Sequence, residues 1–465
     1  MRTFSATFQV SIAIALLSLS YDLSATDYFI DSSSGNDNND GTSATRALRS
    51  VSAANSLALR DGDRVLFATG QSFSGSLSID VSASSASPLV VASFGNGARP
   101  ILEQVTLGGS FVVIEDLIVD QRKGASDALR LRNCTSCTVR RIEVRNGTRD
   151  GIDANGSDSL LIEDVEIHHL LKGAFGGEED AHGIVTTDCN GVTIRRANIH
   201  HVSGDSFQAD PARVPGRVTD NILIEDSTLW TGPLSSDFNS GWRAGQSPGE
   251  NAVDTKVARD NIDSAPRVSL IIRNVTAYGW DRSSGVSNRA AFNLKEKIEA
   301  VVDRVTVYDS EIAFRVRGTF GNANTRIANA VIYDVDTAVR AEDDLQNLTV
   351  FNSTFGQGID RLLQVAGGDA GISSWDWQNN AAIDGFPSSV EGPTNVTASS
   401  SDFRNTHDDD YELIASSRLV NQGTTLPSVT VDRLGRQRSA PYDIGAYELN
   451  GAAPKQPNPP ILRVD

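Results

Sequence analysis

Sulfur is scarce in this sequence, whose 465 residues include three cysteines and one methionine. Three cysteines cannot form a disulfide framework. Cys134 and Cys137 stand in a strand-turn pattern and lack the βαβ context of a redox motif. We therefore expect buried or turn cysteines with at most one bridge, and we assign no chemistry to them.

Long apolar runs are absent beyond the N-terminal end. Arg2, the apolar run from Val10 to Leu19 and the small residues up to Ala25 are typical of a secretory signal peptide over residues 1–25. No later stretch is apolar for long enough to cross a bilayer. We expect a secreted or periplasmic protein with no membrane partner.

Positive charge is in deficit, with 41 Lys and Arg residues against 59 Asp and Glu residues and a formal net charge of −18. Such a surface repels the phosphate backbone of a nucleic acid, so it argues against a nucleic-acid partner. Any local group of cations stands out against this acidic background.

A short pattern of two β-formers followed by two polar residues recurs from residue 111 onward. The apolar markers of this pattern are Ile114, Val139, Ile162, Ile194, Ile224, Ile272, Val302, Ile327 and Val350, with spacings of 25, 23, 32, 30, 48, 30, 25 and 23 residues. A basic period of 23 to 25 residues with several short β segments is typical of a parallel β-helix. A leucine-rich repeat shares the period, but its Leu-x-x-Leu-x-Leu skeleton is missing. The sequence predicts an all-β fold, a right-handed single-stranded parallel β-helix.

The ends of the solenoid need covers. Apolar residues at helical spacing over 44–59 predict an amphipathic capping helix, within an N-terminal part of cap and first turns over 26–110. The β-helix proper is expected over 111–400 and a closing cap over 401–450. The Pro-rich stretch 451–465 reads as a disordered tail. We expect a monomer.

The long spacings are consecutive, so extra loops gather on neighbouring turns between Ile162 and Val302. Side by side, such loops form the walls of a groove. The same turns carry four similar segments, in which the second and fourth residues point inward and the third and fifth point outward. These segments are Ser206–Asp210, Ala252–Lys256, Ala291–Lys295 and Ala313–Arg317.

Stacking of these segments about 4.8 Å apart places Lys256, Lys295 and Arg317 in one outward column. Like charges on neighbouring strands are destabilising, so the column predicts an anionic ligand. The alternative is that these cations are structural and form a ladder of salt bridges with Asp210, Asp254 and surface acids.

Three motifs resemble the lysine-base pectate lyases among the parallel β-helix polysaccharide lyases. They are Gly204–Phe207, Glu250–Asp254 and Ala291–Lys295, although Glu250-Asn251 replaces an Asp pair and Lys295 lies two residues beyond the expected lysine. In another respect the chain is similar to the chondroitinase B and alginate lyase group, since a Lys is followed about one turn later by an Arg.

The resemblance implies Ca²⁺ held by Asp205, Asn251 and Asp254, and a lysine base. These three residues have the alternative role of orienting the lysines. Ca²⁺ prefers oxygen ligands of this kind.

Cleavage of a uronate polymer by β-elimination needs a group that neutralises the carboxylate, a base for the C5 proton and a donor for the leaving oxygen. A lysine among cations has its ammonium form disfavoured, which favours Lys295, between Lys256 and Arg317, as the base. Arg315 or Arg317 would hold the substrate carboxylate. We therefore predict a lyase acting on alginate, pectate or a glycosaminoglycan.

Further residues are candidate contacts to the anionic polysaccharide. His182 is either a proton donor or a turn-stacking histidine. Asn293 faces outward, Arg259 and Arg282 lie in loops, and Trp242 could stack on a sugar.

Three other functions remain open. Asp210 and Asp254, one turn and two residues apart, would lie about 8 Å from each other, within the window of an inverting glycoside hydrolase. A uronate C5-epimerase would use the same base and clamp as a lyase. A non-catalytic glycan-binding β-helix would use the cations without turnover.

Overall fold

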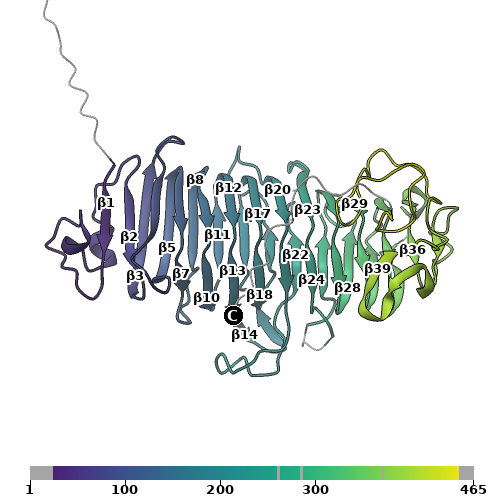
Figure 1. The fold of residues 1–465 in the computed structure, drawn as a ribbon, viewed down its shortest axis with the longest axis horizontal. Coiled ribbons are helices and arrows are strands. Elements are labelled where there is room, and N and C mark those ends of the chain that lie inside the picture. Colours follow the sequence, from purple (N-terminus) through teal and green to yellow (C-terminus); the bar gives the residue numbers. More distant parts are fainter. Residues whose placement is uncertain (1–24, 259–261, 283–285, 369–370, 450–465) are drawn as a thin grey trace, which may run out of the picture.

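The computed structural model describes residues 25–258, 262–282, 286–368 and 371–449. Short strands stack along one long axis, and the chain advances steadily from the N-terminal end to the C-terminal end of an elongated body (Figure 1). Nearly all strand pairings are parallel, so the molecule is a β-solenoid and the predicted fold class is confirmed. The predicted signal peptide, apart from Ala25, and the predicted tail lie outside the described residues.

Three parallel sheets, here called A, B and C, form the sides of the solenoid. Sheet A contains β1 (Asp27–Ile30), β2 (Arg64–Ala68), β4 (Leu89–Phe94), β6 (Val112–Glu115), β9 (Thr138–Arg140), β12 (Asp158–Glu163), β17 (Asn190–Arg195), β20 (Asp220–Glu225), β23 (Val268–Arg273), β26 (Ile298–Asp303), β29 (Asn324–Ala328), β32 (Asn347–Phe351) and β35 (Asp376–Gln378). Sheet B contains β3 (Ser72–Ser82), β5 (Ile101–Ser110), β8 (Leu129–Thr135), β11 (Ile152–Asn155), β16 (Ile184–Thr187), β19 (Phe207–Ala209), β22 (Asn251–Thr255), β25 (Ala290–Leu294), β28 (Ser310–Arg317), β31 (Val335–Glu342) and β34 (Ile359–Ala366). Sheet C contains β7 (Ile118–Asp120), β10 (Glu143–Gly147), β13 (Glu166–Leu170), β18 (Asn198–Val202), β21 (Thr228–Trp230), β24 (Thr276–Tyr278), β27 (Thr306–Tyr308), β30 (Val331–Ile332), β33 (Thr354–Phe355), β36 (Ala381–Ala382) and β37 (Val396–Thr397).

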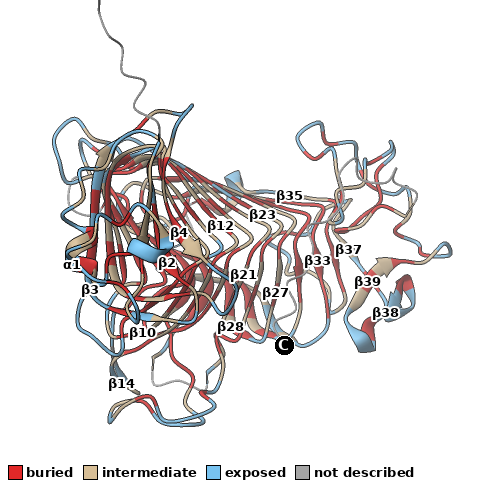
Figure 2. Ribbon diagram, turned by 60° about the vertical axis from the view of Figure 1, so that its left-hand side comes forward, coloured by how far each residue is buried: buried red, intermediate tan, exposed pale blue. Residues whose placement is uncertain are grey.

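The repeat seen in the sequence is the ladder of sheet A. All nine apolar markers, from Ile114 to Val350, pair in one unbroken register from β6 to β32. Their side chains are buried in the main core, which fills the interior of the solenoid (Figure 2). The periodicity therefore reports one stacked inward position.

The corner between sheets A and C is made by one residue per turn with positive φ. The first five of these are Asp116, Arg141, Asp164, Arg196 and Asp226, with φ from 51° to 59°. Acids and arginines alternate from turn to turn here, so each arginine pairs with acids of the turn before, as Arg196 does with Asp164 at 2.6 Å and Glu163 at 2.7 Å. The recurring Glu-Asp and Arg-Arg pairs of the sequence are thus a ladder of ion pairs along the corner.

The N-terminal cap differs from the prediction. In place of an amphipathic helix over 44–59, the chain forms a 3₁₀ turn at Ala44–Arg46 and a single helical turn, α1 (Val51–Ala54). Asp37 accepts hydrogen bonds from the backbone of Arg49 and Ser50, which holds the segment before α1 in extended form. Val51 and Ala54 are nevertheless buried against the core, so the short turn does cover the apolar residues beneath it.

Beyond the solenoid, β38 (Phe403–Asn405) and β39 (Asp410–Leu413) form an antiparallel pair. Tyr411 and Phe403 pack with Ala381 of β36 in a separate apolar cluster. Other short elements are 3₁₀ turns at Ile372–Ser374, Ser400–Asp402 and Thr406–Asp408, and a hairpin of β14 (Lys172–Ala174) and β15 (Gly177–Glu179) that projects from the side of the solenoid (Figure 1).

The cysteines Cys134, Cys137 and Cys189 are all free and buried. Within the described residues, no helix is long and apolar enough to cross a membrane.

A column of stacked rings runs along sheet C. The rings of Trp230, Tyr278, Tyr308 and Tyr333 lie 4.8–5.6 Å apart with interplanar angles of 4–6°. The histidine pairs of β13 and β18 extend the column at its N-terminal end, where His200 stacks on Trp230 at 4.4 Å.

Burial makes His201 of this column sensitive to acid. It lowers the pKa of His201 to about 3, and the neighbouring His200 and His169 add to the shift. The unfolded chain binds the proton near pH 6.5, so the stability from neutral His201 is present above that pH and is lost as the pH falls below it.

When the pH falls from about 7.5 to about 5, the free energy of unfolding should decrease by about 2 kcal/mol less in His201→Asn than in the wild type. Asparagine tolerates the positive φ of 50° at this position. Urea unfolding at the two pH values measures the difference. His407→Asn, at an exposed histidine, is the control, and its free energy of unfolding should decrease with pH as much as that of the wild type. An equal decrease in both variants would contradict the prediction.

Candidate active site

The four similar segments of the sequence lie in register on sheet B. Phe207, Val253, Phe292 and Phe314 pair along the inward column and are buried. Gln208, Asp254, Asn293 and Arg315 pair along the outward column. The predicted alignment of the segments is therefore confirmed.

The two lysines of the outward face share one carboxylate. Lys295 Nζ lies 2.9 Å from Asp254 Oδ1, and Lys256 Nζ lies 3.6 Å from Asp254 Oδ2. Lys256 also donates to Gln208 Oε1 at 2.6 Å. The Asp254 side chain is 2% exposed, whereas those of Lys295 and Lys256 are 13% and 23% exposed, so the ammonium groups reach the surface above a buried acid.

The backbone of Lys295 is fixed by a neighbouring side chain. Thr255 Oγ1 accepts from the Lys295 N–H at 2.8 Å and donates to the Lys295 carbonyl at 2.9 Å. This reciprocal pair joins two turns at the ends of β22 and β25. The side chain of Lys295 consequently leaves a rigid backbone.

The charge environment of Lys256 differs from the prediction. Burial disfavours its ammonium, but the acids around it, first Asp205 and Asp254, outweigh burial and raise the pKa. Acids of two neighbouring turns thus stabilise the ammonium of Lys256; the expectation that flanking cations disfavour the ammonium of Lys295 stays a prediction.

The predicted carboxylate clamp is already engaged with protein acids. Leu294 pairs with Val316, so Lys295 and Arg317 follow on adjacent turns as predicted. Arg315 and Arg317 both contact Glu342 of β31, at 3.0 and 3.1 Å, and Arg317 also contacts Asp343 at 3.0 Å. Glu342 lies outside the four aligned segments, so the sequence did not indicate it as the partner of these arginines.

A second polar row runs at the start of the sheet B strands, as the sequence suggested. Asp150 Oδ1 accepts from the His182 N–H at 2.8 Å, and His182 Nδ1 accepts from the Asp205 N–H at 2.9 Å. Asn251 Nδ2 donates to Asp205 Oδ1 at 2.7 Å, and Asn251 Oδ1 accepts from the Ala290 N–H at 3.2 Å. Each side chain thus binds the next turn.

The three predicted calcium ligands do not fit calcium as they are arranged. Both ends of the Asn251 amide are used, and Asp254 faces two ammonium groups. Burial raises the pKa of Asp205 well above its usual value, with Asp254 and Glu250 adding to the effect, which disfavours the anionic form that Ca²⁺ prefers. Within the described residues, no three acids, histidines or cysteines form a group that could hold a metal ion.

The predicted substrate contacts lie in different environments. Trp242 cannot stack on a sugar, because it is 0% exposed and its Nε1 donates to the Lys172 carbonyl at 3.0 Å. Asn293 faces outward but is 5% exposed. Arg282 pairs with Asp336. Arg259 lies outside the described residues.

Trp242 has a structural role in the wall beside the site. With Leu171, Leu234 and Phe238 it forms a small apolar cluster, which joins the loop after β21 to the β14–β15 hairpin. The tryptophan of this long loop is therefore a buried part of the cluster, and the groove that the long spacings indicate stays a prediction.

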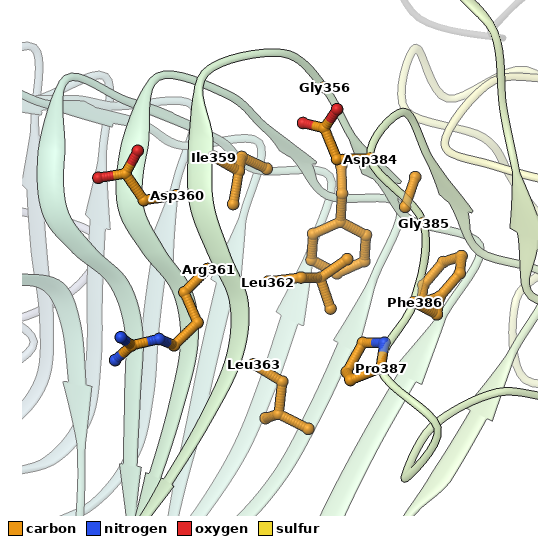
Figure 3. A pocket seen from close by; sticks show the side chains of 12 residues that line it. Gly356, Ile359, Asp360, Arg361, Leu362, Leu363, Asp384, Gly385, Phe386 and Pro387 are labelled. Carbon is orange, nitrogen blue, oxygen red and sulfur yellow. The ribbon is translucent and has the colours of Figure 1, made fainter.

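Two hollows bear on the site. One, of about 240 Å³, adjoins the lysines and is lined by Gln208, Asp210, His182 and neighbouring charged residues. Another, of about 280 Å³, lies three turns beyond β25, between β34 and the segment around Phe386 (Figure 3). Leu362 and Leu363 contribute to its lining, and it has no row of lysines.

No protein-family model matches the chain, and no curated protein matches it significantly. Solved structures do match. A crystal structure of pectate lyase Pel9A aligns with a TM-score of 0.52 at 15% identity, over 92% of this chain and 98% of that one. A rhamnogalacturonan lyase aligns with a TM-score of 0.48 at 12% identity, over 92% and 96%. The catalytic domain of a GH87 α-1,3-glucanase aligns with a TM-score of 0.46 at 10% identity, over 76% and 68%.

At these identities the likenesses show the fold alone. The chain has the parallel β-helix fold of polysaccharide lyases such as pectate lyase Pel9A, as its motifs suggested. The fold does not determine the reaction, which has to be argued from the side chains.

Removal of the shared carboxylate should destabilise the protein. We expect Asp254→Ala to lower the free energy of unfolding by about 3 kcal/mol, because two neighbouring ammonium groups lose their buried counter-charge. Urea unfolding measures the loss. Asp237→Ala removes a carboxylate from an exposed pair with Arg243 and should leave stability near the wild-type value; similar losses in the two variants would contradict this account.

Proposed function

We propose that the protein is a secreted polysaccharide lyase that cleaves a uronate-containing polymer by β-elimination, with Lys295 as the base. The observation that supports this most is the pair of ammonium groups on the single carboxylate of Asp254, on the outer face of a polysaccharide-lyase-like β-helix. The adjacent arginines complete a row of cations suited to an anionic polymer.

The shared carboxylate gives the two lysines different roles. Lys256 lies among four acids, which raise its pKa despite burial, so it keeps its proton. Lys295 is therefore the member of the pair that accepts the C5 proton, while Lys256 remains an ammonium.

The substrate carboxylate would bind beside Lys256 and the arginines. Lys256 supplies positive charge that neutralises the uronate and acidifies the C5 proton. Arg315 and Arg317 reach the same face and would exchange one contact with Glu342 for a contact with the substrate. Electrons from the C5–H bond form the C4–C5 double bond as the bond to the leaving oxygen breaks, and the proton that Lys295 took from C5 passes to that oxygen, which returns Lys295 to its neutral form.

Calcium remains a separate hypothesis drawn from the resemblance. The arrangement of Asp205, Asn251 and Asp254 favours a reaction without it, since Lys256 and Lys295 occupy the positions around Asp254 where a cation would bind. We expect a chelator to leave the rate unchanged. Loss of activity with chelator and its return with added Ca²⁺ would contradict this expectation.

We expect Lys295→Ala to lower the rate of unsaturated uronate formation by at least about 100-fold, because the base is removed. The assay follows ultraviolet absorbance on alginate, pectate, chondroitin sulfate and hyaluronan. Lys297→Ala is the matched control, since Lys297 donates to the Ala265 carbonyl away from Asp254; it should retain turnover. Unchanged turnover in Lys295→Ala would refute the assigned base.

A hydrolase is the second candidate, and one observation favours it. Burial raises the pKa of Asp210 even though Arg213 and Lys256 oppose the shift, while Asp254 faces two ammonium groups. An inverting hydrolase needs a carboxyl group with a raised pKa near a second carboxyl group. New reducing ends without absorbance, lost in Asp210→Asn, would replace the lyase by the hydrolase.

A further inference from the structure

Side chains bind the backbone of several strands at the two ends of the solenoid. In β3, the first strand of sheet B, Asn55 Nδ2 donates to the Ser76 carbonyl and Asn55 Oδ1 accepts from the Ser78 N–H, both at 2.9 Å. In β35, the last strand of sheet A, Asn395 Nδ2 donates to the Trp377 carbonyl at 2.8 Å. These amides take the place of a neighbouring strand.

The last strand of sheet B, β34, has a free edge. Among the described residues it pairs with β31 alone, so alternate backbone N–H and C=O groups face a side without a strand. None of its eight residues is buried. In sheet C, by contrast, Arg418 Nη2 donates to the Thr397 carbonyl of the last strand, β37, at 2.6 Å. An exposed edge such as that of β34 is a template for a further strand.

The chain after β36 does not continue sheet B. One turn earlier, the residues after β33 lead into β34, whereas residues 383–395 lead to β37, which pairs with β36. Pro387 and Pro393 in this segment lack the N–H groups that a strand needs, and Val390 is buried in the main core. The segment therefore packs against the core, and the hollow of about 280 Å³ lies between it and β34 (Figure 3).

This hollow suits apolar side chains of an added strand. Ile359, Leu362 and Leu363 line it from β34, and Phe386 and Pro387 line it from the opposite side. The first three and Phe386 pack against the core but are only partly buried. Covering them would remove apolar surface from water, which favours binding of a strand here.

A segment outside the described residues has the alternation of sheet B. Residues 462–465 read Leu-Arg-Val-Asp, whereas residues 314–317 of β28 read Phe-Arg-Val-Arg and residues 339–342 of β31 read Val-Arg-Ala-Glu. In β28 and β31 the first and third residues of the pattern are buried, and the arginine reaches the surface. The sequence of residues 462–465 is therefore suited to a further strand of this sheet.

We propose that residues 461–465, here called the tail strand, bind the free edge of β34 in the same molecule as a parallel strand. Leu462 then lies beside Leu363, and Arg463 lies beside Gln364. This register continues the inward and outward columns that run from β28 through β31 to β34. It also brings no like charges together, since the outward neighbour of Arg463 is an amide.

The intervening chain is long enough for this pairing. Leu449, the last described residue, packs on the apolar cluster that includes Ala381 of β36, at the same end of the solenoid as β34. The eleven residues 450–460 are rich in proline, and an extended Pro-rich chain of this length spans about 34 Å. β34 itself is about 26 Å long. The tail strand can therefore reach the free edge.

Hydrogen exchange of the full chain tests the pairing. In Leu462→Asp/Val464→Asp the tail strand loses its apolar side, so N–H groups on the free edge of β34 should exchange at least about tenfold faster than in the wild type. Mass spectrometry follows exchange in peptides that cover residues 359–366. Equal exchange in the two proteins would overturn the proposal.

Two comparisons separate the pairing from a general change in stability. Leu462→Ile/Val464→Leu keeps the alternation, so β34 should exchange as slowly as in the wild type. β3, to which Asn55 is bound, should exchange equally in all three proteins. Faster exchange in β3 together with β34 would show a general loss of stability and would also overturn the proposal.

Disulfide trapping tests the register. Paired residues of neighbouring strands lie about 4.8 Å apart, a distance that a disulfide can bridge. With oxidised glutathione, Gln364→Cys/Arg463→Cys should form a link within one chain at least about tenfold faster than Gln364→Cys/Val464→Cys, because Val464 would face the opposite side of the sheet. The native cysteines are buried. Equal rates would exclude the strand. A link between two chains, seen as a dimer on a non-reducing gel, would assign the edge to a second copy and overturn the proposal.

Discussion

Hydrogen bonding between consecutive turns is the constraint on which the rest of this structure depends. Because the strands are parallel and in register, a residue's neighbours are the residues at the same position one turn before and after it. An apolar side chain at one position is therefore repeated at the same position of the next turn, and a charge or an unpaired backbone group is compensated there. Apolar columns fill the core, the acid–arginine alternation of the A–C corner neutralises itself, and the row from Asp150 to Ala290 satisfies backbone groups of the next turn.

The site follows from the same constraint. Asp254, Lys256 and Lys295 come from segments about forty residues apart, yet register alone brings them together. Burial of the acid beneath two ammonium groups is costly unless each charge has a partner, and the network through Gln208 and Asp210 supplies those partners. The lysine pair is thus held in place before any substrate arrives.

The sequence predicts the columns better than the contacts within them. Alternation with period two determines that Phe292 points inward and Asn293 outward, so the ladder of sheet B was predictable from spacing. Whether Arg317 is free or bound to Glu342 depends on a residue one turn later, outside the four segments. The prediction that Trp242 stacks on a sugar was wrong for a similar reason. The sequence cannot distinguish a buried tryptophan in a long loop from an exposed one, because the hairpin that covers it is known only from the structure. The helix expected over 44–59 was wrong because Asp37 accepts from the backbone N–H groups of Arg49 and Ser50, and the chain is extended at Ser50, between the 3₁₀ turn and α1.

The aromatic column of sheet C has one more consequence. Between Trp230 and Tyr333 the ring planes differ by only 4–6° from one turn to the next, so these turns stack with little tilt against one another. The long axis therefore bends little along this part of the solenoid. Sheet B, which the same turns carry, follows a straight line here, and several units of an extended polymer could lie along it.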